Sequence, residues 1–376
     1  MRILVSGSHG LIGSALLPGL IEEGHEPLRL VRCRAGHPAR RSIVQCRDPV
    51  ADHERTSQGD RNRSEEKATK GADTHETQDD NPPSQAACSS HAKEKGPEQA
   101  EPIGAEALDI ELQWNPERGD IDQAALGRID VVVHLAGENV ASGRWTPAKK
   151  RRLWESRVRD TRQLCEALAA CPTPPKTLLA ASGVGIYGDG SLEDVRDQSG
   201  RPAPFLAELC RQWEAATEPA REVMRVVNMR FGVVLSGEGG ALTMMVPTFR
   251  RGLGAPLGGG RQQISWVALA DVVRAISFLI AHEEIQGPVN VTSPNPVSNA
   301  ELTTALNERL RRPWHFLLAP LRIGVPRFAL RLLLGEMADE MLLSSIHATP
   351  DELLSHGFQF KYSRVEDVLG AIFVDR

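Results

Sequence analysis

The sequence begins with MRILVSGSHGLIG (residues 1–13), in which strand-type residues Ile3 to Ser6 run directly into a glycine-rich turn. The glycines are spaced G-x-x-G-x-x-G at Gly7, Gly10 and Gly13, and the residues after them indicate a helix. In doubly wound sheets such a turn binds a dinucleotide: the glycines permit the tight turn, the approach of the pyrophosphate and close helix–strand packing. The phosphates then bind free N–H groups at the positive end of the helix. We therefore expect a dinucleotide-binding loop rather than an ordinary glycine-rich connection.

Beyond this turn, strand and helix patterns alternate along the chain. Apolar runs indicate strands at 27–32, 130–135, 177–182 and 224–235, and periodic stretches indicate helices at 11–23, 147–169 and 205–218. Thr146 is expected to cap the second of these helices, with Pro147 at its first position. This order predicts an α/β fold, a Rossmann-type doubly wound parallel sheet with a smaller C-terminal substrate lobe. We divide the chain into a Rossmann domain (1–235), a substrate lobe interleaved with it (236–324) and a helical C-terminal domain (325–376).

The composition and net charge of the chain indicate which classes of molecule it can bind. The chain has 376 residues, 41% of them hydrophobic, and a net charge of −5, so it has a large core and no excess of positive charge for nucleic acid. A basic stretch at 149–162 is best explained as a solvated helix face, in which only Arg157 suggests a function. The most apolar stretch, 314–334, is interrupted by three arginines and two prolines. We expect a cytoplasmic protein with a small-molecule substrate and no membrane partner, and a homodimer is compatible with the sequence.

The cysteines do not form a recognisable pattern. Six of them are scattered along the chain, and no two make a C-x-x-C pair. Such spacing indicates neither a disulfide framework nor a zinc site, and we expect no bound metal.

One internal segment differs sharply in composition from the rest. Residues 51–102 contain no Ile, Leu, Val, Phe, Met, Trp or Tyr. A segment of this kind cannot bury enough apolar surface to offset the entropy lost on ordering. We predict a disordered insertion in a surface loop, with boundaries near 47–104. The alternative is a regulatory or partner-binding segment.

The end of the second strand indicates which dinucleotide is bound. An acidic residue there would bind the free 2′-hydroxyl of NAD, but this chain has Arg32, whose guanidinium suits the 2′-phosphate of NADP. The alternative is that Arg32 only begins an exposed loop. Leu135-Ala136-Gly137 and Ser182-Gly183-Val184 end two further strands and should line the same crevice, because ligands bind at the carboxyl ends of parallel strands.

Several ordered motifs resemble those of a known family. They are SGSHGLIG (6–13), HLAGENV (134–140), RWTPAKKRRLWESRVRDT (144–161), SGVGIYGD (182–189), QWEAA (212–216), RFGVVLSGEGGAL (230–242), GRQQISWVALAD (260–271) and PDELLSHGFQF (350–360). Together they are similar to the extended short-chain dehydrogenases/reductases, in particular the epimerase-like YfcH branch with its short C-terminal domain. The resemblance covers nearly all of the chain except roughly residues 35–107.

The resemblance implies a cofactor and a class of reaction. It implies NADP bound by Gly7, His9, Gly10, Leu11, Ile12, Gly13, Arg32, Leu135, Ala136, Gly137, Arg157 and Val184. It also implies an oxidoreductase or nucleotide-sugar-epimerase activity, in a branch whose substrate is generally unassigned.

The catalytic pair of this superfamily is missing. Its usual members carry Tyr-x-x-x-Lys on a helix, where the lysine lowers the pKa of the tyrosine that serves as acid and base. Only Tyr187 and Tyr362 are present, and neither is followed by lysine four residues later. If Glu214 matches the glutamate that follows the pair in sugar-nucleotide members, Leu206 and Cys210 take the tyrosine and lysine positions.

Other residues are candidates for the missing chemistry. We select Ser182 and Tyr187 as catalytic candidates, because both follow a strand that should end at the crevice. The alternative for Ser182 is a serine at a strand end that is hydrogen-bonded only to the backbone. The alternative for Tyr187 is a Tyr-Gly turn with a structural role. Glu208 is a weaker candidate base, Cys210 is expected to pack against the sheet, and His134 to be a hydrogen-bonded core histidine.

The substrate side is predicted from a glycine-rich segment, residues 252–271. There Arg261, Gln262 and Trp266 offer polar and aromatic contacts, although Arg261 has the alternative of lying on the lobe surface. Asp271 is expected to cap the helix that follows it.

Two functions are therefore compatible with the sequence. The first is an NADP-dependent oxidoreductase or epimerase-like enzyme acting on a small carbonyl, sugar or nucleotide sugar with non-standard acid and base groups. The second is an NADP(H)-binding sensor or scaffold without efficient chemistry, which the absent Tyr–Lys pair favours.

Overall fold

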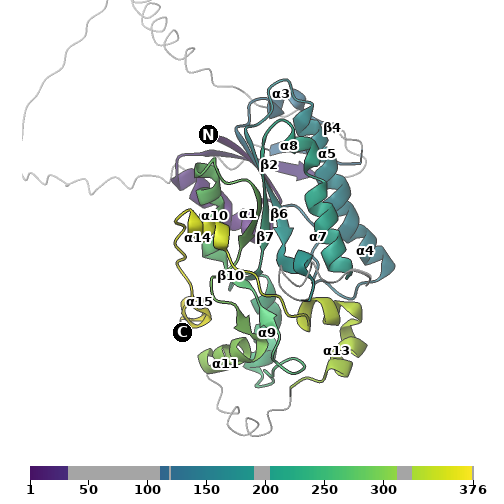
Figure 1. Ribbon diagram of the computed structural model, residues 1–376, viewed down its shortest axis with the longest axis vertical. Coiled ribbons are helices and arrows are strands. Elements are labelled where there is room, and N and C mark those ends of the chain that lie inside the picture. Colours follow the sequence, from purple (N-terminus) through teal and green to yellow (C-terminus); the bar gives the residue numbers. More distant parts are fainter. Residues whose placement is uncertain (33–110, 118–119, 190–203, 311–323, 375–376) are drawn as a thin grey trace, which may run out of the picture. The chain divides into compact units, whose positions relative to one another are not determined.

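The computed structural model describes residues 1–32, 111–117, 120–189, 204–310 and 324–374, and all structural statements below concern these residues (Figure 1). They belong to one compact unit. The insertion predicted at 47–104, including the segment 51–102, lies outside the described residues.

An eight-stranded sheet forms the centre of this unit, in the order β11-β7-β6-β5-β1-β2-β3-β4. Its strands are β1 (Arg2–Ser6), β2 (Glu26–Arg32), β3 (Glu111–Asn115), β4 (Asp120–Ile121), β5 (Val131–His134), β6 (Thr177–Gly183), β7 (Arg225–Phe231) and β11 (Gly287–Val291). Seven of these described strands run parallel, and the short β4 pairs with β3 in the antiparallel direction. The strand order reverses between β1 and β5, which is where doubly wound sheets bind their ligands. The predicted Rossmann-type α/β fold is confirmed.

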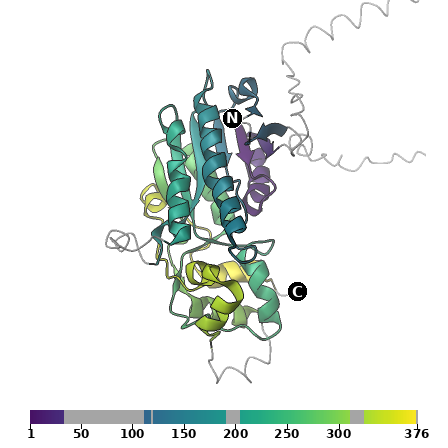
Figure 2. The same cartoon turned by 90° about the vertical axis from the view of Figure 1, so that its right-hand side faces the viewer.

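Helices cover both faces of the sheet (Figures 1 and 2). One face carries α1 (Leu11–Glu22), α10 (Leu269–Ala281) and α14 (Asp351–Ser355), and the other carries α3 (Gln123–Leu126), α4 (Pro147–Trp154), α5 (Asp160–Ala169), α7 (Phe205–Ala215) and α8 (Glu218–Arg221). The alternation of side chains along β1 separates the two cores, because Ile3 and Val5 pack with Leu16 of α1 while Leu4 packs with Leu164 of α5.

The helix predicted at 147–169 is continuous but contains a π-helical turn, η2 (Glu155–Arg159), between α4 and α5. Thr146 caps α4 as expected, since its hydroxyl accepts the N–H of Lys149 at 3.2 Å, and Pro147 occupies the first position. A π turn widens a helix locally and changes the direction of the side chains that follow.

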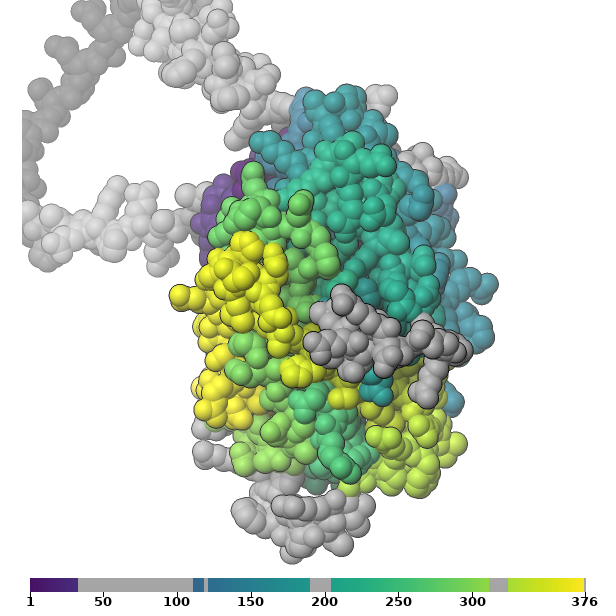
Figure 3. Space-filling view, in the orientation of Figure 1, coloured from purple at the N-terminus to yellow at the C-terminus, as the bar shows by residue number. Residues whose placement is uncertain are grey.

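The remaining elements form a smaller lobe. They are β8 (Val233–Leu235), α9 (Ala241–Arg250), β9 (Gln263–Ile264), β10 (Trp266–Ala268), β12 (Val297–Ser298), α11 (Asn299–Arg309), α13 (Arg327–Leu334), the π turn η5 (Ala338–Leu342) and α15 (Val365–Ile372). Trp266 lies in the core of this lobe with Leu306 of α11 and Leu369 of α15. The C-terminal residues also reach the main sheet, where α14 lies against β11 and Leu353 and Phe358 join the hydrophobic core that also contains Ile3 and Val5. Figure 3 shows this C-terminal segment in yellow, lying against green segments from the middle of the chain.

The expected role of Asp271 is wrong. Helix α10 begins at Leu269 with Ala268 as its N-cap, so Asp271 already lies in the first turn. Its buried carboxylate accepts the backbone N–H groups of Lys361 at 2.7 Å and Tyr362 at 2.9 Å. Asp271 therefore anchors the C-terminal segment to α10 instead of capping the helix.

Candidate functional site

The glycine turn after β1 has no room for side chains. Gly7 has φ +70°, and a Cβ atom there would lie 2.8 Å from the backbone N of Ala136. A Cβ atom at Gly13 would lie 2.7 Å from the Cα of Ser8. Gly10 is the N-cap of α1, and the first turn of this helix has no side-chain cap and no acidic residue. The backbone can thus approach a ligand closely, and the positive end of α1 is not neutralised locally.

A crevice of about 700 Å³ lies at the carboxyl ends of β1, β5 and β6, beside this turn. It brings together most of the residues predicted to hold the coenzyme. They are Gly7, Gly10, Leu11, Ile12, Gly13, Leu135, Gly137, Arg157 and Val184, together with the catalytic candidate Ser182. His9 is exposed and does not line the crevice; its Nε2 lies 3.2 Å from Nη1 of Arg29.

A second cavity of about 500 Å³ extends the crevice toward the end of β2. It shares Gly7 and Gly10 with the crevice and also contains Ala136 and Arg32. Nη2 of Arg32 lies 2.5 Å from Oδ2 of Asp160, and Nη2 of Arg159 lies 2.9 Å from the other carboxylate oxygen. Asp160 is fully buried, whereas both arginines are about two-fifths exposed (43% and 42%). Arg32 is thus held in the second cavity, at the end of β2, next to a second arginine that sequence reasoning missed.

His134 contacts Ser6, the residue immediately before the glycine turn. Its Nδ1 lies 2.7 Å from the hydroxyl oxygen of Ser6, and its Nε2 lies 2.9 Å from that of Thr161. The Ser6 oxygen also accepts the N–H groups of Leu135 and Ala136. Burial, aided by the charge of Arg32, lowers the pKa of His134 to about 4. The histidine is therefore neutral at pH 7, and the expectation of a hydrogen-bonded core histidine is confirmed.

This lowered pKa predicts a loss of stability in acid. The unfolded chain takes up a proton on His134 near its ordinary pKa of 6.5, while the folded chain does so only near 4. Stability is thus fully present above pH 6.5 and decreases as the pH falls through 4, by about 3 kcal/mol for this group. Urea denaturation between pH 7.5 and 4 should show a steeper decline for the wild type than for His134→Gln. Equal declines in the two proteins would contradict this assignment.

The end of β6 connects to a buried polar network. The Ser182 hydroxyl donates to Oε1 of Glu214 at 2.7 Å, and Arg230 donates to both Glu214 oxygens at 2.7 and 2.8 Å. Arg230 also donates to the Tyr187 hydroxyl at 2.9 Å, and this hydroxyl donates to Oδ1 of Asn290 at 2.7 Å. Tyr187 is 3% exposed and lines neither the crevice nor the second cavity. The structure therefore brings Ser182 to the crevice and places Tyr187 behind it.

Leu206 and Cys210, which take the tyrosine and lysine positions if Glu214 matches the family's glutamate, both line the crevice from α7. They are one helical turn apart, so they face the same side. Burial raises the pKa of the Cys210 thiol to about 12, which keeps it protonated and a poor nucleophile, in agreement with a packing role. Glu208 points elsewhere and pairs with Arg211 at 3.1 Å.

The C-terminal segment contributes Glu340, Met341 and Ile346 to the crevice wall. The Glu340 carboxylate accepts the N–H of Phe205 at 3.0 Å and that of Leu206 at 2.7 Å, and so caps α7. Burial raises the pKa of Glu340 despite these hydrogen bonds. Glu340 is distant in sequence from its partners, and no local pattern could have identified it.

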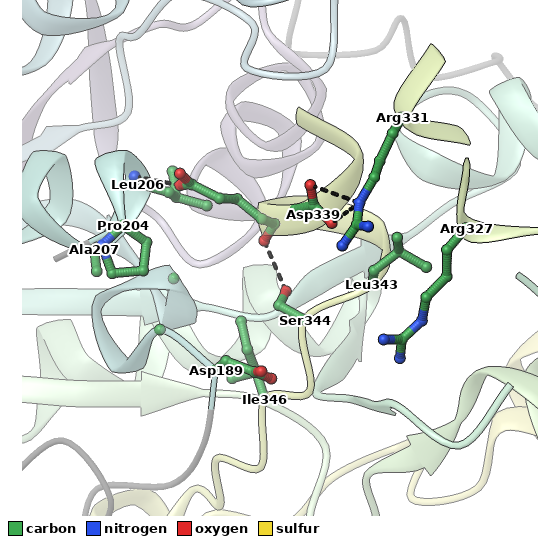
Figure 4. Close-up of a pocket in the computed structure, with 13 residues that line it drawn as sticks. Asp189, Pro204, Leu206, Ala207, Arg327, Arg331, Asp339, Leu343, Ser344 and Ile346 are labelled. Carbon is green, nitrogen blue, oxygen red and sulfur yellow. Dashed lines mark hydrogen bonds and ion pairs between the residues drawn. The ribbon is translucent and has the colours of Figure 1, made fainter. Parts of the chain in front are cut away.

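Next to this wall lies a smaller cavity of about 280 Å³, shown in Figure 4. It is bordered by Leu206 and Ile346 on the crevice side and by Arg327 and Arg331 of α13 on the other. Arg331 pairs with Asp339 at 2.8 Å, so this arginine is only partly available for a ligand.

The residues predicted for the substrate side line neither the crevice nor the second cavity. Gln262 is buried, and its side-chain N–H groups donate to the carbonyls of Leu257 and Leu342 at 3.1 and 2.9 Å. Trp266 is fully buried and donates its indole N–H to the carbonyl of Asn295. Arg261 is exposed on the lobe. The first two hold the lobe together, and their contact with a substrate stays a prediction.

Comparison with known proteins agrees with this geometry. The profile of the NAD dependent epimerase/dehydratase family matches residues 87–292, and that of a domain of unknown function (DUF1731) matches residues 325–372. An epimerase family protein of Mycobacterium bovis is 45% identical over 267 residues, which are 71% of this chain and 86% of that protein.

Solved structures show the same fold. The human epimerase family protein SDR39U1, crystallised with NADPH, has a TM-score of 0.67 at 22% identity, with full coverage of both chains. A nucleoside-diphosphate sugar epimerase of Corynebacterium glutamicum has a TM-score of 0.61 at 27% identity, over 99% of this chain and 58% of that one.

Within the described part of the chain, no helix has the length and apolar character needed to cross a membrane. With its extended short-chain dehydrogenase/reductase fold, the chain is an NAD(P)-binding member of the NAD dependent epimerase/dehydratase family.

Proposed function

We propose that this protein binds NADP(H) along the two connected cavities. The diphosphate would lie against the Gly7–Gly13 turn, with the adenosine 2′-phosphate at Arg32 and the nicotinamide half toward the ends of β5 and β6. The observation that carries the proposal is Arg32 held beside the glycine turn by buried Asp160. The residues fit the coenzyme, because the turn forms a cradle that a Cβ atom would fill. When bound, the coenzyme supplies or accepts a hydride.

We further propose that the rest of the crevice takes a small carbonyl, sugar or nucleotide-sugar substrate. Leu206, Met341 and Ile346 offer an apolar wall there, and Glu340 offers a carboxyl that can exchange a proton in place of the absent tyrosine. The Corynebacterium glutamicum relative, named as a nucleoside-diphosphate sugar epimerase, supports this substrate class.

A second candidate function is an NADP(H)-binding sensor with little turnover. Leu206 and Cys210 favour it, because neither can perform the proton transfer of the Tyr–Lys pair. The two candidates differ in consumption of NADPH across a panel of aldehydes, ketones and nucleotide sugars. Turnover with any of them supports the enzyme, and binding without turnover on the whole panel supports the sensor.

The coenzyme preference is tested by Arg32→Met. We expect the Kd for NADPH to rise roughly tenfold or more, since a hydrogen bond between charged groups contributes about 1.5–3 kcal/mol, while the Kd for NADH stays unchanged. Asp160 keeps Arg159 as a partner in this variant, so no buried charge is left unpaired. Tryptophan quenching measures both constants.

The matched control is Arg162→Met, which removes an arginine of α5 that is 59% exposed and pairs with Glu166. It should leave both affinities unchanged. Equal affinity of the wild type for NADPH and NADH would overturn the proposed preference for NADP(H).

A further inference from the structure

The cavity of about 280 Å³ shown in Figure 4 adjoins the crevice, and we call it the side pocket. The residues that line both spaces are Gly185, Leu206, Glu340 and Ile346. On the opposite side, Arg327 and Arg331 extend from α13 (Figure 4). A ligand that lies in the crevice beside Glu340 can therefore extend into the side pocket.

Most charged groups around the side pocket already have partners in the protein. Arg331 pairs with Asp339 at 2.8 Å, and Oδ1 of Asp189 accepts the backbone N–H of Ser345 at 2.7 Å. The carboxylate of Glu340 accepts two backbone N–H groups at the start of α7. Each of these four charged side chains is thus bonded within the protein.

Arg327 is the exception among these charged side chains. It is exposed, and it forms no ion pair and no hydrogen bond with any residue that the structure describes. Its Cγ and Nε lie 3.2 and 3.3 Å from the position that a Cβ atom of Gly258 would take, so the side chain lies against this glycine. The N–H of Gly258 donates to the carbonyl of Val325 at 2.8 Å, and that of Val325 to the carbonyl of Pro256 at 2.8 Å. The glycine-rich loop therefore holds an uncompensated guanidinium at the side pocket.

The start of α13 adds positive charge beside Arg327. Arg327 is the first residue of this helix, Pro326 at the N-cap gives no side-chain hydrogen bond, and the first turn contains no acidic residue. The free N–H groups of a helix N-terminus carry a partial positive charge that favours anions. A guanidinium binds both oxygens of a carboxylate or phosphate in a bidentate manner. The ligand group that fits beside Arg327 is therefore an oxyanion.

The size and the remaining lining of the side pocket limit the molecule that carries this anion. Leu206, Leu343 and Ile346 provide apolar surface for a carbon skeleton. A volume of about 280 Å³ lies below the range of roughly 300–1,000 Å³ that is common for pockets of drug-sized ligands. The side pocket thus fits a short acidic chain rather than a nucleoside diphosphate.

We propose that the side pocket is a subsite for the substrate, in which Arg327 binds a carboxylate or phosphate group. The substrate is then a small anionic compound that extends from Glu340 in the crevice to Arg327. This inference rests on the proposed function, because it takes the crevice to be the substrate site. It narrows the substrate class to acids and phosphate esters of small carbonyl compounds and sugars, and it gives the C-terminal domain a role in their recognition.

The first test measures the binding of a simple anion. Inorganic phosphate is titrated by calorimetry into protein saturated with NADPH, at constant ionic strength, so that the glycine turn and Arg32 are already occupied. We expect Arg327→Gln to weaken phosphate binding at least tenfold, as for the loss of a hydrogen bond between charged groups. A second titration with acetate distinguishes a carboxylate site from a phosphate site.

The matched control is Arg364→Gln. This arginine also belongs to the C-terminal domain, is 70% exposed and pairs with Glu366. It lines neither the crevice, the second cavity nor the side pocket. Both titrations should therefore give the same result for Arg364→Gln as for the wild type.

The second test compares the turnover of matched neutral and anionic substrates with NADPH. The pairs are glyceraldehyde with glyceraldehyde 3-phosphate, and glucose with glucuronate. The wild type should reduce the anionic member of a pair with the higher kcat/KM. Arg327→Gln should raise the KM of that member at least tenfold without changing kcat or the neutral member, because only binding of the anion is lost. Arg327→Lys keeps the charge without the bidentate geometry and should recover part of the loss.

Several outcomes would overturn the inference. Unchanged binding of phosphate and acetate in Arg327→Gln would do so, as would an equal loss in Arg364→Gln or a preference for the neutral substrates. A nucleotide sugar that is turned over with an unchanged KM in Arg327→Gln would also contradict it. If no pair is turned over, the titrations alone decide.

The failure of this inference can be told apart from the failure of the proposed function. If the wild type binds neither NADPH nor NADH, the proposed function fails, and titrations of the wild type and Arg327→Gln without coenzyme still decide on the side pocket. A wild type that binds NADPH but neither phosphate nor acetate overturns this inference alone.

Discussion

Replacing Gly13 with alanine is expected to weaken NADPH binding roughly 100-fold, because overpacking by one methyl group at this contact should cost up to about 3 kcal/mol. The new Cβ atom would stand 2.7 Å from the Cα of Ser8, and only backbone movement can relieve this contact. Such movement displaces the N–H groups that would bind the diphosphate. Titration of the tryptophan fluorescence with NADPH measures the loss, and the melting temperature shows how much stability is lost with it.

Gly19→Ala provides a matched control within the same helix. Its Cβ atom would meet Cγ1 of Val273 at 3.5 Å, which is an ordinary contact. Because alanine favours helix more than glycine does, this variant should be more stable by about 0.5–1 kcal/mol and bind NADPH normally. Normal NADPH binding by Gly13→Ala would show that the turn does not contact the diphosphate.

Breaking the ion pair between Glu214 and Arg230 is expected to destabilise the protein by about 4 kcal/mol. Both side chains are only 14% exposed, and each is the main partner of the other. Burial alone would lower the pKa of Arg230, but the hydrogen bonds and charge of Glu214 raise it overall, so the arginine stays charged. Either Glu214→Gln or Arg230→Met leaves the opposite charge buried without compensation. Urea denaturation measures the free energy of unfolding.

Two companion variants define this effect. The double variant Glu214→Gln/Arg230→Met should be more stable than the sum of the single losses predicts, because no uncompensated charge remains. Tyr187→Phe removes only a hydroxyl from the same network and should cost about 1–3 kcal/mol without affecting the crevice. Additive losses in the double variant would show that the pair contributes no coupling.

The sheet and the gathering of the glycine turn, Arg32 and the strand ends around one groove were predictable because their signals are local in sequence. The turn from Gly7 to Gly13 joins a strand to a helix directly, and Arg32 ends the next strand. The carboxyl ends of parallel strands lie along one edge of the sheet. The residues Leu135-Ala136-Gly137, which follow one of these strands, were therefore expected beside the glycine turn. Leu206 and Cys210, which the resemblance assigns to the catalytic pair if Glu214 matches the family's glutamate, both line the crevice, and their assignment stays a prediction.

Features that depend on tertiary packing could not be predicted in this way. The π turn at Glu155–Arg159 has no sequence signature, and the directions of the side chains in it could not be predicted. The pairing of Arg159 with Asp160 beside Arg32 was therefore missed. Trp266 and Gln262 looked like substrate contacts because aromatic and polar side chains follow a glycine-rich segment. In the fold, their polar atoms bond to backbone carbonyls, a packing role that the sequence did not indicate.

The hydrophobic core that β1 shares with the segment around Leu353 has a consequence for protein synthesis. Leu353 and Phe358, which a ribosome adds long after Ile3 and Val5 of the first strand, complete the same hydrophobic core beside β11. Contacts of such long range form late, and the apolar face they cover stays open on the nascent chain until then. A premature stop codon ahead of Leu353 would leave that face permanently uncovered, so the truncated product should be a target for chaperones and proteases.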